Sequence, residues 1–218
     1  MKIALALPIL AFAQTESLNY AVNWPSGLTL GEGSLVTRPV ESGYSIELRL
    51  EASIAGFAIV DTYRSTVNQS GCSLAFEKES VHGKRKSAER STFEAGTLTR
   101  QTSGGGKSQT SAGPCPRDAL AFIRFLRKEL AGGRLPPAQT IYFGAAYQAR
   151  LQYAGAETIT VGESRVEADR LMAIIKGPAS ELSFEIWFAH DEPRTPLLFK
   201  LPLAVGLFSM ELVHPEIK

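Results

Sequence analysis

Residues able to carry redox or metal chemistry are scarce in this chain. Its 218 residues include two cysteines and three histidines. Neither Cys72 nor Cys115 belongs to a Cys-x-x-Cys motif, so the sequence gives no support to thiol redox catalysis. His82, His190 and His214 are far apart and form no His-x-His or His-Glu-x-x-His motif. The sequence therefore predicts no metal site and no cofactor.

The sequence also has no clear excess of positive or negative charge. The 23 basic and 22 acidic residues leave a formal net charge of +1, which excludes a general attraction to nucleic acid or to an anionic membrane. A local basic cluster lies between two expected strands. It could steer an anionic partner such as a phospholipid headgroup, or it could be a charged hairpin tip that keeps a sheet edge soluble. The cluster consists of Lys84, Arg85, Lys86 and Arg90.

Motifs of common enzymes are absent as well. No Gly-x-Ser-x-Gly elbow singles out a nucleophile. Gly104–Ser108 resembles part of a phosphate-binding loop, but Gln101 stands where that motif needs its first glycine, so we interpret the segment as a flexible linker. Four carboxylates on expected strands mostly have outward-facing positions, and a catalytic pair among them is not favoured. They are Glu47, Glu51, Asp61 and Glu185.

No apolar run is long enough to span a membrane, and the longest candidate is at the N-terminus. Ile3–Phe12 follows Lys2, and Ala11-Phe12-Ala13 has the small-x-small form of a signal-peptidase site. This pattern predicts a signal peptide over residues 1–13 and a soluble periplasmic protein, because a spanning helix needs about 20 apolar residues. No cysteine stands directly after the cleavage site, which argues against a lipid anchor. The alternative is a first buried strand of a cytosolic protein.

One segment, Asp118–Leu130, is typical of an amphipathic helix. Its apolar residues recur every three or four positions and gather on one face, whereas Arg124, Arg127 and Lys128 are expected opposite. The initial aspartate suits an N-cap, and a Gly-Gly pair beyond the segment predicts where the helix ends.

Most of the remaining chain alternates between apolar and polar residues, as half-buried strands do. The clearest examples are Tyr44–Glu51 and Leu182–Ala189. Gly31 and Gly33 interrupt an earlier strand and predict a bulge or a sharp bend there. We count about a dozen strands joined mostly by short turns, which favours antiparallel pairing because parallel pairs need long crossovers.

These elements predict a mainly β fold in one domain. After the signal peptide, residues 14–218 are expected to form a β-rich domain with a Gly/Ser/Thr-rich loop at 103–117 and the helix at 118–130. The expected architecture is a single curved antiparallel sheet or half-open barrel of about a dozen strands, with one helix packed against its concave face. Cys72 and Cys115 either form a disulfide, if the protein is exported, or remain two free thiols.

The strands carry more bulky apolar residues than one short helix can cover. The sheet must therefore bend partly around itself, and its interior is either solid or an apolar cavity for a lipid-like ligand. In the second case five strand residues would line the cavity and one of two helix residues would plug it. The strand residues are Trp24, Tyr44, Phe57, Phe184 and Phe188, and the helix residues are Phe122 and Leu126.

A set of distributed motifs resembles the bacterial family called domain of unknown function 3108, exported proteins of the cell envelope, from about Glu16 to Val213. The motifs are Leu18-x-Tyr20-x-Val22-x-Trp24 with Gly27 and Gly31, Asp61-x-Tyr63-Arg64-Ser65, Asp118, and Ile186-Trp187-Phe188 with Asp191, Arg194, Pro196 and Gly206.

This resemblance implies a mostly antiparallel β protein similar to the curved-sheet lipoprotein carriers of the periplasm, with a helix against the sheet, and it brings no catalytic residues. The chain departs from the family pattern in its weak leader and in a shortened linker before the helix. We expect a non-enzymatic protein that binds a hydrophobic or amphipathic envelope component. The alternatives are a scaffold partner with a solid core and, third, a hydrolase, which would need a cleft with a histidine near a serine or carboxylate.

Overall fold

The computed structural model describes residues 14–54, 56–178, 181–203 and 206–213, which form fourteen strands and one helix. In chain order these are β1 (Glu16–Asn23), β2 (Thr29–Val40), β3 (Gly43–Ile54), β4 (Phe57–Asn68), β5 (Ser73–His82), β6 (Arg85–Glu94), β7 (Thr97–Thr102), β8 (Lys107–Ser111), α1 (Ala119–Ala131), β9 (Gln139–Tyr142), β10 (Ala146–Val161), β11 (Ser164–Lys176), β12 (Glu181–Ala189), β13 (Pro196–Leu203) and β14 (Gly206–Leu212).

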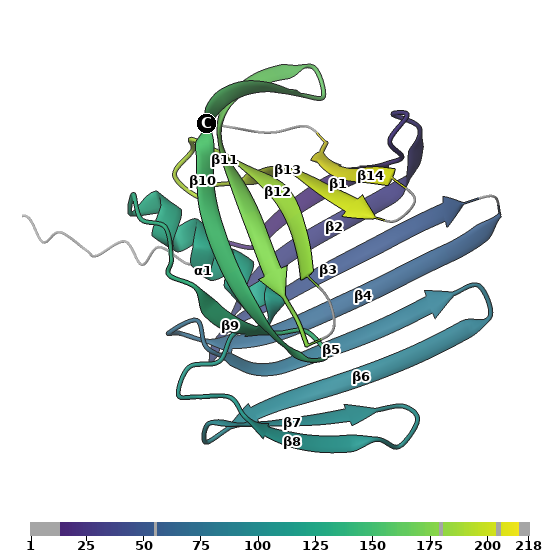
Figure 1. Ribbon diagram of the computed structural model, residues 1–218, viewed down its shortest axis with the longest axis vertical. Coiled ribbons are helices and arrows are strands. Elements are labelled where there is room, and N and C mark those ends of the chain that lie inside the picture. The colour runs from purple at the N-terminus through teal and green to yellow at the C-terminus, as the bar shows by residue number, and fades with distance from the viewer. Residues whose placement is uncertain (1–13, 55, 179–180, 204–205, 214–218) are drawn as a thin grey trace, which may run out of the picture.

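All strands belong to one antiparallel sheet, in the order β8-β7-β6-β5-β4-β3-β2-β1-β14-β13-β12-β11-β10-β9. Two meanders are therefore joined where β1 pairs with β14. Figure 1 shows that the sheet curls, so that β10, β11 and β12 cross over the face formed by the earlier strands. The edge strands β8 and β9 do not pair with each other, so the barrel stays open. The predicted fold class is confirmed.

Two glycines lie where strands bend. Gly31 faces a register shift in β1 between Val22 and Asn23, and a Cβ atom added to it would lie 1.9 Å from the Glu51 carbonyl oxygen. Only glycine allows β2 and β3 to approach this closely. In β10, Gly155 has a φ of +125° next to a second register shift, so this long strand contains a bulge. The bend predicted near Gly31 is confirmed.

Helix α1 is held by its first turn. Asp118 is its N-cap and accepts hydrogen bonds from the backbone N–H groups of Leu120 and Ala121. The same buried carboxylate accepts hydrogen bonds of 2.6 Å from the Ser65 and Ser73 hydroxyls, which come from β4 and β5. Burial raises the pKa of Asp118, and these four hydrogen bonds oppose the rise. The N-cap therefore marks the start of the helix and also ties it to the sheet.

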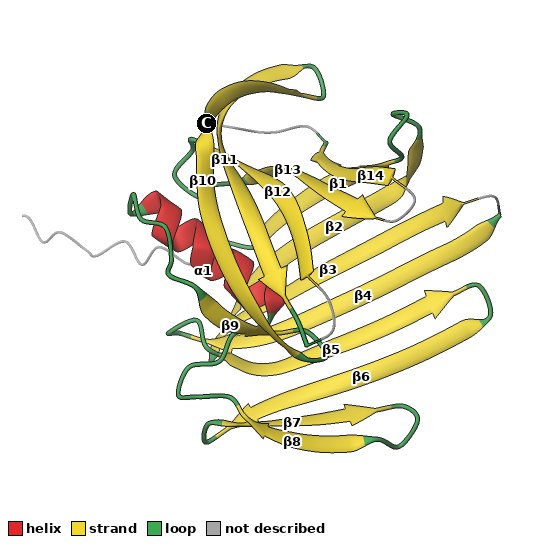
Figure 2. Cartoon of the chain, in the orientation of Figure 1, coloured by secondary structure: helices red, strands yellow, loops and turns green. Residues whose placement is uncertain are grey.

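A disulfide secures the same end of the helix. Cys72, in the turn between β4 and β5, is bonded to Cys115, just before α1. Beside it the Ser73 N–H donates to the Pro116 carbonyl. The sequence left open whether the two cysteines pair, and the structure shows that they do. The disulfide fixes the start of α1 to the sheet. Figure 2 shows the helix lying at one end of the curl.

Two expectations need comment. Residues 103–117 were expected to form a loop, yet they contain β8, which pairs with β7 because its polar residues can occupy an exposed sheet edge. Gly104–Ser108 lies in the turn between these strands and at the start of β8, not in a phosphate loop.

Across the described ranges, no helix has both the length and the apolar character needed to cross a membrane. The expected signal peptide, residues 1–13, lies outside the described residues.

Candidate functional site

A cavity of about 510 Å³ lies between α1 and the inner face of the curled sheet. Its walls come from both halves of the sheet, and nearly all its sheet residues are apolar. The sheet residues are Leu35, Thr37, Ile46, Leu48, Leu50, Tyr63, Ile141, Tyr147, Leu151, Ala173, Ile175, Leu182, Phe184, Ile186, Phe199, Leu201 and Met210, with Phe143 following β9. This size and a mostly apolar lining are typical of small-molecule binding pockets.

Helix α1 contributes the remaining wall and, among the described lining residues, the only charged side chains. Leu120, Phe122 and Ile123 face the cavity together with Arg124 and Arg127. The sequence predicted both arginines opposite the apolar face of the helix, yet both line the cavity. The helix lies at one end of the curl and contacts β3, β4 and β9, so part of its polar side also faces protein.

Arg127 is fully engaged by protein groups. Its guanidinium donates two hydrogen bonds, of 2.7 and 2.6 Å, to the Glu16 carboxylate on β1. Its Nε also donates to the carbonyls of Pro193 and Arg194 in the turn between β12 and β13. The charge of Arg127 is therefore neutralised, and its side chain is a bridge that holds the helix to two distant parts of the sheet.

Arg124 is bound differently. Its guanidinium carbon lies 3.6 Å from the centre of the Tyr44 ring, a cation–π contact that fixes its orientation. Among the described residues it makes no ion pair and no side-chain hydrogen bond. The half-buried Arg124 is thus a cation that lines the cavity without a counter-charge.

Tyr63 supplies a neutral polar group at the cavity wall. Burial raises its pKa, and the neighbouring Asp61 raises it further. Asp61 is also within 3.0 Å of the His82 ring. The Tyr63 ring packs at 5.3 Å from Phe143, so its phenol stays protonated and mainly adds contact area.

The seven predicted binding residues are distributed over several places. Phe122 and Phe184 line the cavity. Tyr44 lies beside it under Arg124, whereas Leu126 and Phe188 are fully buried in the core. Trp24 packs against Phe208, and Phe57 is half exposed at the turn between β3 and β4, so neither reaches the cavity. Alternation shows which strand residues face inward. Whether an inward residue lines the cavity, is buried in the core or is exposed at a turn depends on the position of its strand in the curl.

The residues that the sequence analysis missed come from the same inward rows. Leu48 lies in a strand it identified, and Ile175 and Met210 continue the alternation of β11 and β14. That alternation could have found them. The helical period places Arg124 one turn after Leu120, beside the apolar stripe, but only the curl of the sheet shows that this side of the helix lines a cavity.

Two histidines lie near carboxylates, the feature that a hydrolase would need in a cleft. His82 is next to Asp61, and His190 lies 2.9 Å from Asp169, which also binds Arg194. Neither histidine lines the cavity, and neither is hydrogen bonded to a serine within the part of the chain that the structure describes. That part also contains no cluster of side chains suited to a metal ion.

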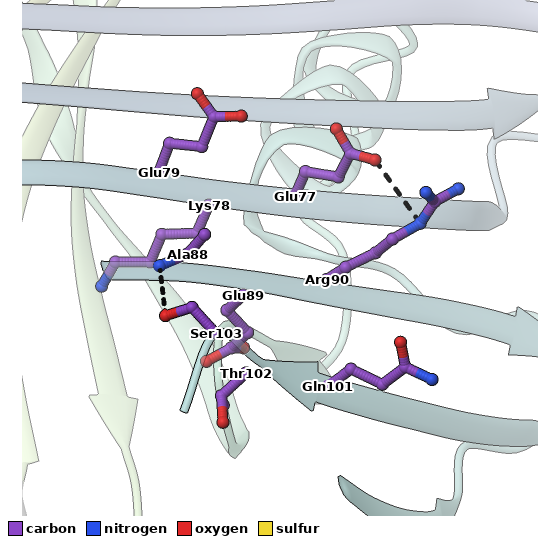
Figure 3. Close-up of a pocket in the computed structure, with 9 residues that line it drawn as sticks. All are labelled: Glu77, Lys78, Glu79, Ala88, Glu89, Arg90, Gln101, Thr102 and Ser103. Carbon is purple, nitrogen blue, oxygen red and sulfur yellow. Dashed lines mark hydrogen bonds and ion pairs between the residues drawn. The ribbon is translucent and has the colours of Figure 1, made fainter. Parts of the chain in front are cut away.

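A second, polar hollow lies on the other face of the sheet, across β5, β6 and β7. Figure 3 shows Glu77 facing Arg90, at 3.5 Å, and the Ala88 N–H bonded to the Ser103 hydroxyl. Within the hollow only Glu77 and Arg90 pair, whereas Glu79 pairs with Arg64 and Glu89 with Arg100 outside it, and the small Ala88 side chain leaves room for the depression. The basic cluster belongs to the β5–β6 hairpin, with Arg85 and Lys86 at the start of β6.

The comparisons with known proteins agree with this fold. The profile of the family described as "Protein of unknown function (DUF3108)" matches residues 19–213. The chain is also similar in structure to a β-barrel-like protein of domain of unknown function DUF1849 from Brucella abortus. The TM-score is 0.64 with 10% identity, covering 90% of this chain and 94% of that one. No curated protein matches the sequence.

Proposed function

We propose a binding function for this chain, which belongs to the DUF3108 family of proteins of unknown function. In this proposal the protein is not an enzyme and holds a hydrophobic or amphipathic molecule of the cell envelope between α1 and the sheet. The observation that carries it is the apolar cavity of about 510 Å³. The location we propose is the periplasm, supported by the predicted signal peptide.

The lining explains how such a ligand would be bound. An alkyl chain that leaves water for this cavity gains about 0.8 kcal/mol for each methylene buried. Affinity should therefore rise about fourfold with each added methylene until the cavity is full. Such a dependence is specific to an enclosed apolar site, because an exposed apolar patch covers only one side of a chain.

Native mass spectrometry after gentle purification tests the proposal directly. We expect additional mass in the protein that disappears in the variant Leu48→Trp, because the indole would fill the cavity next to Tyr63. The matched control is Leu74→Trp, where the leucine is 38% exposed on β5 and does not line the cavity. A folded wild-type protein that carries no ligand and takes up no alkyl chain of any length would refute the proposal.

A second candidate function is a scaffold that recruits another protein through a sheet edge. It is favoured by β8, all five residues of which are exposed and which has one strand neighbour. Polar β8 is short, as edges that avoid strand addition are, so we rank this candidate second. A photo-crosslinker at Gln109 on β8, compared with one at the exposed Arg165 on β11, would trap a partner selectively if it were right.

A further inference from the structure

We infer that the ligand is a long-chain carboxylate whose headgroup pairs with Arg124 while its alkyl chain fills the cavity. This inference rests on the proposed function and adds the class of ligand. It follows from Arg124, the one charge in the described cavity lining that no described residue of the protein neutralises.

The two arginines of the lining differ in what they can offer. Arg127 is 11% exposed, and Glu16 and two carbonyl oxygens occupy its guanidinium. Arg124 has only the face of Tyr44, a contact that leaves the N–H groups at the edge of the guanidinium plane unoccupied. A ligand anion can therefore bind Arg124 without breaking an existing ion pair.

The charge of the site selects the headgroup. With Arg127 neutralised by Glu16, the lining has one net positive charge. A carboxylate carries one negative charge and matches the planar guanidinium with two parallel hydrogen bonds. A phosphate monoester carries about −1.5 to −2 at pH 7 and would need a second cation, which the described lining lacks.

The arrangement also orients the ligand. Arg124 is half-buried, so a carboxylate bound to it would keep part of its hydration. The apolar wall formed by Leu48, Ile175 and Phe184 is free of charge and would take the alkyl chain. The tyrosine stack under Arg124 limits the motion of the guanidinium, so little side-chain entropy is lost when the anion binds.

Calorimetric titration with matched ligands at pH 8 tests the inference. The probes are dodecanoate, the uncharged 1-dodecanol and lauroyl-lysophosphatidylglycerol, which is an anionic phosphodiester. For Arg124→Gln we expect the Kd of dodecanoate to rise about tenfold or more, because a charged hydrogen-bonded pair is lost, and that of dodecanol to stay within about twofold. Arg124→Lys should recover part of the loss, which also shows that the site is folded.

Lys128→Gln is the matched control. It removes one exposed positive charge from the same helix without touching the cavity, and it should leave dodecanoate binding unchanged. An equal loss in this variant would mean that net charge, and not Arg124, attracts the anion, and the inference would be wrong.

The outcomes separate the inference from the proposed function. If wild-type protein binds neither dodecanoate nor dodecanol, the binding function itself fails. If it binds both equally and Arg124→Gln changes nothing, the function stands and the carboxylate assignment is overturned. Tighter binding of lysophosphatidylglycerol than of dodecanoate, with the same loss in Arg124→Gln, would also overturn the assignment to a carboxylate.

Discussion

One row of inward-facing side chains crosses six strands and changes character halfway. The first three members line the cavity and the last three do not, although all six are paired in register. We call the part on β2–β4 the apolar wall and the part on β5–β7 the polar wall. The row runs Leu35, Leu48, Tyr63, Lys78, Glu89 and Thr102.

The polar wall contacts the turn between β9 and β10, which belongs to the other half of the sheet. Glu89 forms an ion pair with Arg100, and the Lys78 ammonium lies 5.2 Å from the centre of the Phe143 ring. The turn between β9 and β10 comes close enough that a Cβ on Gly144 would lie 3.4 Å from a Glu89 carboxylate oxygen. The curl thus gives contact with the other half of the sheet along the polar wall and a partly open cavity along the apolar wall.

We expect changes to the polar wall to alter stability and leave ligand binding intact. Changes to the apolar wall should alter ligand binding and have little effect on stability. The boundary between the walls, where α1 begins, should affect both.

The largest effect is expected at that boundary. Replacing both cysteines, Cys72→Ser with Cys115→Ser, opens a link with a sequence separation of 43 residues and should lower the free energy of unfolding by about 4 kcal/mol. Denaturant unfolding measures the loss, and reduction of the wild-type protein should reproduce it. An unchanged midpoint would show that the hydrogen bonds of Asp118 hold the helix without the disulfide.

Those hydrogen bonds give the next largest effect. Asp118→Ala removes an acceptor shared by Ser65, Ser73 and the helix N-terminus, and it leaves buried donors without partners. We expect a loss of about 3 kcal/mol in unfolding free energy together with weaker dodecanoate binding. Ser73→Ala, which leaves the other three donors in place, should cost less. Equal costs for the two variants would contradict the role of Asp118 as the common acceptor.

A smaller effect is expected within the polar wall. Glu89→Gln weakens the pair with Arg100 and should reduce stability by about 1–3 kcal/mol, because the carboxylate is mostly buried. The Kd of dodecanoate should not change, because Glu89 does not line the cavity. Glu94→Gln, an exposed position on the same strand, is the control. Altered ligand affinity in Glu89→Gln would break the separation between the two walls.

The smallest effect is expected at Tyr63, where the apolar wall ends. Tyr63→Phe should change stability at pH 7 by less than about 1 kcal/mol. Because burial and Asp61 raise the pKa of Tyr63 above its unfolded value, the stability due to this group is complete below about pH 10 and lost at higher pH. Wild-type protein should therefore lose more stability than Tyr63→Phe in alkaline unfolding experiments. Parallel pH profiles would show that Tyr63 is solvated.

Local patterns were sufficient for most of the elements. Alternation in Tyr44–Glu51 and Leu182–Ala189 identified strands that the structure contains, and the aspartate before the apolar stripe identified the N-cap of α1. The excess of bulky apolar residues also predicted that the sheet bends. The exception is β8, because a polar edge strand has no buried face and therefore no alternation.

The sequence by itself determined the strand content, the helix with its cap and the need for a curved sheet, because these depend on neighbouring residues and on total apolar area. Only the tertiary structure decided the pairing of β1 with β14, the Cys72–Cys115 disulfide and the position of Arg124 in the cavity lining. These depend on contacts between residues far apart in the chain. The curl of the sheet brings these residues together. The local alternation of apolar and polar residues does not show which strands come to lie over one another.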